Sequence, residues 1–139
     1  MRSGNGFVAA VLRSPVHRLL SGSTDLVRYR GRRSGREITT PTQYASIGDD
    51  VVILVGHPER KTWWHNFDTE RDLDLLIRGE WIAMAGRTVS GAKEPEVAAP
   101  LLDAYLDRFP RAAASLGEGS RDEQVRRAVL VHCRPRPRR

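Results

Sequence analysis

The chain has 139 residues, of which 40% are hydrophobic and 29% charged, with a formal net charge of +6. This length fits one domain with its own core, and the composition excludes a disordered, collagen-like or coiled-coil chain. No apolar run approaches the roughly 18 residues of a membrane-spanning helix. The uncharged residues 3–12 are few and include two glycines, so we expect no signal peptide and a cytoplasmic protein.

The charged residues are unevenly distributed along the chain. Residues 1–36 carry a net charge of +7, residues 37–107 carry −7 and residues 108–139 carry +6. Basic segments suit nucleic acid, an anionic membrane surface or an anionic small molecule. Aromatic residues are not interleaved with the basic stretches as a nucleic-acid stacking platform requires. We therefore rank nucleic-acid binding last and expect no nucleic-acid partner.

The first half of the chain changes from helical to strand periodicity. Residues 1–23 predict one or two short amphipathic helices that pack on the domain, with peripheral membrane contact as the alternative. Strands are predicted over residues 24–30 and 36–47, joined by a turn, with Pro41 at an edge or a bulge. A further strand is predicted over residues 51–55.

The second half adds strands and one clear helix. Residues 57–68 predict a loop with a short helical turn, followed by strands over residues 72–78 and 81–89. An amphipathic helix is predicted over residues 94–109, a polar connection over 117–124 and a last strand over 128–133. We expect a mainly β domain over residues 24–133, a small barrel of about six strands with flanking helices, and a solvated basic tail over 134–139.

Three segments carry side chains suited to ligand binding. The turn at residues 31–36 presents three arginines, which predict either an anion site or a solvated hairpin tip. Residues 61–67 combine a lysine, two tryptophans, a histidine and an asparagine, a set that suits a planar ligand with polar edges. The alternative there is that the tryptophans plug the barrel end and Asn66 caps backbone. Hydroxyls beside Pro41, over residues 39–44, add a weaker signal.

No nucleophilic or metal-dependent chemistry is indicated. The sequence has no G-x-S-x-G motif, and its four histidines lack metal-ligand spacing, so we expect no metal. Cys133 is the single cysteine, which excludes an internal disulfide. The familiar phosphate-binding loops are also missing.

Three blocks occur in a fixed order along the chain. They are G-R-R-S-G-R-x-x-T-T-P-x-x-Y over residues 31–44, Gly-Asp before the strand at 51–55, and W-W-H-N-F over 63–67. In this order they resemble the deazaflavin (coenzyme F420)-dependent nitroreductase and quinone reductase family. The resemblance implies a split β-barrel of the flavin-binding, pyridoxamine phosphate oxidase-like type, usually dimeric. It also implies hydride transfer from reduced F420 to a quinone or nitroaromatic.

The resemblance implies a set of cofactor contacts as well. The arginine turn and a lysine would face the anionic phosphate and oligoglutamate tail, whereas Trp63 and Asn66 would lie near the ring system. A non-catalytic split-barrel module that binds FMN, haem or another cofactor is the alternative, with FMN as the alternative cofactor. Tyr44, His65 and Tyr105 are weak candidates for a proton donor. The implied cofactor-binding residues are Arg32, Arg33, Ser34, Gly35, Pro41, Tyr44, Gly56, Lys61, Trp63, Trp64 and Asn66.

Overall fold

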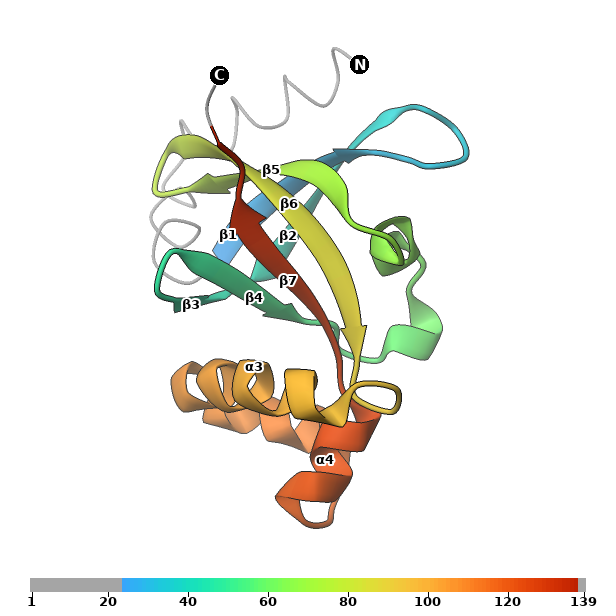
Figure 1. The fold of residues 1–139 in the computed structure, drawn as a ribbon, viewed down its shortest axis with the longest axis vertical. Helices are drawn as coiled ribbons and strands as arrows, with labels where there is room; N and C mark the ends of the chain where they lie inside the picture. Colours follow the sequence, from blue (N-terminus) through green and yellow to red (C-terminus); the bar gives the residue numbers. More distant parts are fainter. Residues whose placement is uncertain (1–23, 138–139) are drawn as a thin grey trace.

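The computed structural model describes residues 24–137, and its strands form one antiparallel sheet (Figure 1). The helices and the membrane contact predicted for residues 1–23 lie outside the described residues. The strands are β1 (Thr24–Arg30), β2 (Glu37–Gln43), β3 (Ala45–Ile47), β4 (Asp50–Leu54), β5 (Arg71–Ile77), β6 (Glu80–Ser90) and β7 (Val129–Pro135). The helical segments are the 3-10 turns η1 (Pro58–Arg60), η2 (Trp63–Phe67) and η3 (Pro110–Leu116), and the α-helices α3 (Pro95–Arg108) and α4 (Arg121–Arg127).

The sheet has the strand order β2-β1-β5-β6-β7-β4-β3 and curls into a half-barrel. The predicted mainly β fold with flanking helices is therefore confirmed. Pro41 lies in β2, which pairs with β1 alone, so its predicted position at an edge is also confirmed. The predicted strand over residues 36–47 is wrong as one unit, because the chain leaves β2 at the buried Tyr44 and starts β3. The described residues thus hold seven strands rather than about six.

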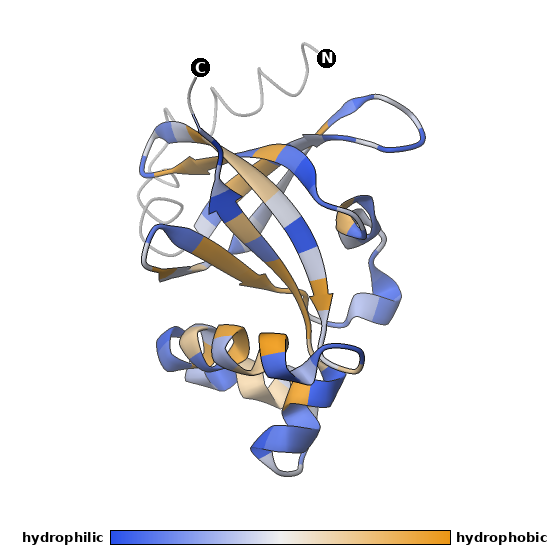
Figure 2. Ribbon diagram, viewed as in Figure 1, coloured by the Kyte–Doolittle hydropathy of each residue, from blue (hydrophilic) through white to orange (hydrophobic). Residues whose placement is uncertain are grey.

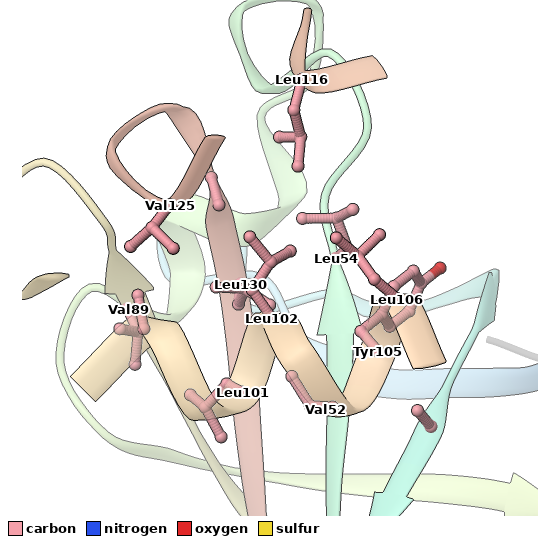
Figure 3. Packing of buried hydrophobic residues seen from close by; sticks show 13 residues of the cluster. Val52, Leu54, Val89, Leu101, Leu102, Tyr105, Leu106, Leu116, Val125 and Leu130 are labelled. Atoms are coloured by element: carbon pink, nitrogen blue, oxygen red, sulfur yellow. The ribbon is translucent and has the colours of Figure 1, made fainter. Parts of the chain in front are cut away.

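Two apolar clusters hold the fold together. One fills the inside of the half-barrel and includes Val27, Phe67 and Leu75. The other lies between the sheet and α3, where Tyr105 and Leu106 point towards Leu54 of β4 (Figure 3). Apolar residues concentrate on β4, β7 and α3, whereas the turn between β1 and β2 is hydrophilic (Figure 2). The helical end is therefore fixed to the barrel by burial of apolar surface.

Two local predictions need correction. The polar segment predicted as a connection over residues 117–124 contains the start of α4, which begins with a capping box. Ser120 accepts from the backbone N–H of Glu123, and the Glu123 carboxylate accepts from the backbone N–H of Ser120. The tail also starts later than predicted, because β7 continues to Pro135. Arg136 then donates to the backbone oxygen of Met84 at 2.9 Å.

We predict that Ser120→Ala lowers the free energy of unfolding by about 1 kcal/mol, because it leaves the backbone N–H of Glu123 without its acceptor. Chemical denaturation of both proteins measures this difference. Ser46→Ala, at an exposed position of β3, is the matched control. Equal losses in the two variants would contradict a specific contribution of the capping box.

Candidate functional site

A cavity of about 530 Å³ lies where the half-barrel does not close, and we call it the seam cavity. Residues 40–43 of edge strand β2 form one wall, and residues 53–56 at the end of β4 form the opposite wall. Lys61, Trp63, Tyr105 of α3 and two small residues of η3, Ala112 and Ser115, complete the lining. The edge of β2 has no strand partner here, so side chains and a cavity take the place of a neighbouring strand.

A second cavity of about 410 Å³ lies beside the arginine turn, and we call it the turn cavity. It is lined by residues 31–34 and Ile38 on one side and by Thr62, His65 and Asn66 on the other. Ile38 and Thr40 are two positions apart on β2 and therefore point to the same face of the strand. Because Ile38 lines the turn cavity and Thr40 the seam cavity, the two cavities are neighbours along β2.

Asn66 joins the arginine turn to η2. Its side-chain oxygen accepts from the backbone N–H of Arg32 at 2.7 Å, and its amide nitrogen donates to the backbone oxygen of Trp63 at 2.7 Å. The alternative in which Asn66 caps backbone therefore describes its contacts correctly. The backbone that it caps belongs to the turn cavity, so Asn66 sets the shape of that cavity.

The two tryptophans have different surroundings. Trp63 packs at an angle against Phe67 and Tyr29, with ring centroids 6.3 and 6.4 Å away, and it also lines the seam cavity. Trp64 lines neither cavity; its indole N–H donates to the backbone oxygen of Pro58 at 3.1 Å. The hydroxyl of Thr88 donates to the backbone oxygen of Trp64 at 2.8 Å, which fixes η2 to β6. Trp64 is thus an anchor for the segment that carries Trp63.

The cations around the two cavities differ in how they are paired. Arg32 lies 3.6 Å from the Asp68 carboxylate, and both side chains are nearly half exposed. Arg33 and Lys61 are exposed and form no ion pair with any carboxylate of residues 24–137. A salt bridge as exposed as that of Arg32 is worth little. All three cations are therefore available to an anionic ligand.

The structure groups the predicted contacts differently from the sequence. Lys61 lies with Trp63 at the seam cavity, whereas Asn66 lies with the arginines at the turn cavity. Pro41 and Gly56 line the seam cavity, and Ser34 lines the turn cavity. Gly35 lines neither; it has a positive φ of 70° and closes the turn with a hydrogen bond to the oxygen of Gly31.

The three candidate proton donors lie in three different places. Tyr44 is 2% exposed and lines neither cavity, and the Arg108 guanidinium lies over its ring. His65 lines the turn cavity, with its ring 3.5 Å from Asp68. Tyr105 lines the seam cavity, and burial raises its pKa to about 12, so its phenol stays protonated. Of the three, Tyr105 alone contributes to the seam cavity.

Asp25 is a polar residue that the sequence analysis missed. It is fully buried on β1 and accepts from the hydroxyl of Thr42, its register partner on β2. Its second carboxylate oxygen has no hydrogen-bond partner. Burial raises the pKa of Asp25 from 3.8 to about 7. The available signal was its position, because Asp25 lies on the same inward face of the strand as Val27 and Tyr29.

A larger groove of about 800 Å³ lies over β1 and β5. Several of its charged side chains pair with one another: Arg28 lies 3.3 Å from Asp74, and Arg136 bridges Asp72 and Asp74. Arg71 also lines the groove, and one of its guanidinium nitrogens is buried without a hydrogen-bond partner. Residues 24–137 contain no cluster of three His, Cys, Asp or Glu side chains that could hold a metal ion. None of the helices in this part of the chain is long and apolar enough to span a membrane.

Comparison with solved structures identifies the fold type. A putative pyridoxamine 5′-phosphate oxidase from Listeria innocua is similar, with a TM-score of 0.52, 9% identity and coverage of 88% of this chain and 90% of the other. The haem storage protein HutZ from Vibrio cholerae has a TM-score of 0.56 and 11% identity, with 91% of each chain covered. An F420-H2 dependent reductase has a TM-score of 0.54 and 11% identity, with coverage of 81% and 95%. The predicted split β-barrel of the pyridoxamine phosphate oxidase-like type is confirmed.

The family follows from a match over most of the sequence. The family model described as F420H(2)-dependent quinone reductase matches residues 8–112, whereas no curated protein matches the chain. The chain therefore belongs to the F420H2-dependent quinone reductase family. It is a reductase whose cofactor is coenzyme F420, as the sequence resemblance implied. The apolar seam cavity and the three available cations fit a planar cofactor with an anionic tail.

We predict that Asn66→Ala releases the arginine turn, because the Arg32 N–H loses its acceptor. Amide hydrogen exchange at Arg32 should accelerate, and the free energy of unfolding should fall by about 1–2 kcal/mol. Gln43→Ala, at an exposed position of β2, is the control. Unchanged protection of the Arg32 amide would show that Asn66 does not hold the turn.

The raised pKa of Asp25 predicts that the free energy of unfolding depends on pH. Between about pH 4 and pH 7 the folded state keeps a proton that the unfolded state releases, so this carboxyl makes stability fall as pH rises. In Asp25→Asn this contribution disappears, and the unfolding free energy should fall less across that range. Denaturant titrations at several pH values measure the slope, with Asp49→Asn in the exposed β3–β4 turn as the control. Identical slopes for wild type and Asp25→Asn would contradict the raised pKa.

Proposed function

We propose that the protein reduces a planar, electron-poor substrate, a quinone or a nitroaromatic, with F420H2 as the hydride donor. The observation that supports this most directly is that the segment of residues 61–66 lines both cavities. This segment contributes Trp63 to the apolar seam cavity and Asn66 to the cationic turn cavity. One ligand with a flat ring system and an anionic tail would satisfy both cavities.

The residues of the seam cavity would hold the ring system. Trp63, Ile53 and Val55 offer apolar contact, while the side chains of Thr40 and Thr42 offer hydroxyl groups to polar ring edges. The residues of the turn cavity would hold the tail. Arginine forks bind phosphate and carboxylate groups through paired hydrogen bonds, and Lys61 adds a positive charge at the seam cavity.

The chemistry of this site needs no nucleophile from the protein. When bound, the reduced deazaflavin supplies a hydride, which carries two electrons. The chain binds and orients cofactor and substrate and excludes water from the seam cavity. Cys133 takes no part, since it is buried and its burial raises the pKa of the thiol. The absence of a catalytic triad in the sequence agrees with this role.

We further propose that the protein is cytoplasmic and forms a homodimer. The homodimer is the assembly that the family resemblance implies. Sedimentation of the purified protein at several concentrations tests the oligomeric state.

The proposed function predicts that Arg32→Ala combined with Arg33→Ala weakens F420 binding at least about tenfold. Each lost charge-assisted contact is worth roughly 1.5–3 kcal/mol before solvent screening. Titration with F420, followed by quenching of tryptophan fluorescence, gives the affinity. Arg78→Ala with Arg126→Ala removes the same charge at two exposed positions away from both cavities and should leave the affinity unchanged.

Parallel titrations with FMN and haem test the alternative of a non-catalytic module. Binding of F420 in preference to FMN, together with F420H2 oxidation by a naphthoquinone or a nitrobenzene, supports the proposal. A preference for FMN or haem, or F420 binding without reduction of either substrate class, would overturn it. Turnover of one class and not the other would settle the substrate.

A further inference from the structure

The buried carboxyl of Asp25 lies next to the seam cavity without being part of its lining. Thr42, which lines the cavity from β2, donates its hydroxyl hydrogen to one Asp25 oxygen. Tyr105, which lines the cavity from α3, is close enough that the Asp25 charge raises the pKa of its phenol. Asp25 is thus connected to the cavity through a residue that a bound substrate can touch.

Burial of the Asp25 carboxyl costs solvation free energy that its hydrogen bonds restore only in part. It is 0% exposed, and one of its two oxygens has no hydrogen-bond partner. The Thr42 hydroxyl and the backbone N–H of Asp25 itself are neutral donors, so a carboxylate buried with them still loses much of its solvation free energy without compensation. Packing alone gives no reason for an acid here, because an apolar side chain would fill this inward position of β1 without that cost.

We propose that Asp25 and Thr42 form a proton relay into the seam cavity, in which Asp25 stores a proton and Thr42 delivers it to the substrate. This inference rests on the proposed function, since it concerns the substrate of that same site. Asp25 acts through Thr42, so Thr42 is the residue that would touch the substrate oxygen.

The relay supplies the second proton that reduction of a quinone requires. Conversion of a quinone to a hydroquinone adds two electrons and two protons, and a hydride brings two electrons and one proton. When Asp25 is protonated, its carboxyl donates to the Thr42 oxygen, the reverse of the bond that the ionised carboxylate accepts, and the Thr42 hydroxyl hydrogen is left for the substrate. The second proton then reaches the substrate oxygen from the Thr42 hydroxyl, and the hydroxyl regains a proton from Asp25. The substrate is reduced, the deazaflavin is oxidised, and the Asp25 carboxylate regains its proton from solvent before the next turnover.

The charged and titratable groups around Asp25 are compatible with this role. Tyr105 on α3 and Cys133 on β7 are both coupled to it, and both stay neutral because burial raises their pKa values. Asp50 adds a negative charge near Cys133, and Arg108 lies over the neighbouring Tyr44 ring. A raised pKa of about 7 keeps part of the Asp25 population protonated at neutral pH.

The test compares wild type with Asp25→Asn, Thr42→Val and Thr42→Ser. The first readout needs no cofactor: carbon-13 NMR of labelled aspartate follows the carboxyl of Asp25 through its titration. Thr42→Val should move the Asp25 midpoint to higher pH, because the Thr42 hydrogen bond lowers that pKa. Thr42→Ser, which keeps a hydroxyl, should restore the wild-type midpoint.

The second readout is the pH profile of kcat with F420H2 and a naphthoquinone. We expect wild-type kcat to fall as pH rises through about 7, with a solvent isotope effect on kcat. Asp25→Asn and Thr42→Val should each lower kcat about 10²-fold and remove the fall of kcat with rising pH. The affinity of Asp25→Asn for F420 should stay unchanged, because Asp25 is not part of the cavity lining, and Thr42→Ser should recover most of the rate.

The outcomes separate the relay from the proposed function. Wild type that reduces quinone, with Asp25→Asn showing the same pH profile and isotope effect, would overturn the relay alone. Lower F420 affinity in Asp25→Asn would also overturn it, since the carboxyl would then serve binding. Wild type that does not bind F420 would overturn the proposed function itself. If Asp25→Asn does not fold, the Thr42→Val and Thr42→Ser pair decides the result.

Discussion

The feature on which the site depends is a sheet that curls without closing. β2 and β4 approach each other, yet neither is the other's hydrogen-bonded neighbour. Pro41 has no N–H to offer a partner strand, and the chain turns at Tyr44 to start the opposite edge of the same sheet. The interior of the half-barrel therefore opens to a ligand along this seam. Tyr105 and the small residues of η3 cover one end of it.

A short segment couples the two cavities that this arrangement creates. Trp63 is held by the aromatic cluster with Tyr29 and Phe67, and Asn66, one turn later, holds the arginine turn. The backbone of η2 is itself fixed to β6 through Thr88. A shift of η2 would therefore change both cavities together. This explains why the arginine turn and the tryptophan block belong to one pattern although they lie about thirty residues apart in the sequence.

Periodicity was sufficient for elements that bury one face. β1 has the predicted bounds, and α3 differs from its prediction by one residue at each end. The sequence did not predict α4, because its pattern is polar and its main signal is the Ser120–Glu123 capping box. The seam cavity and the position of Asp25 were also missed, since both depend on which strands remain unpaired. The resemblance named eight of the twenty-one residues that line the two cavities. It grouped Lys61 with the arginines and Asn66 with Trp63, whereas the cavities group Lys61 with Trp63 and Asn66 with the arginines.

The charge distribution of the sequence has a simple structural explanation. The basic segments at both ends pair with acids of the middle segment: Arg28 with Asp74, Arg134 with Glu70 and Arg136 with Asp72. Part of the opposition between the segment charges of +7, −7 and +6 is thus compensated by ion pairs among the described residues. Anion binding depends on the cations that these ion pairs leave available. Arg33 and Lys61 are such cations, and both lie beside the cavities that a planar ligand with an anionic tail would occupy.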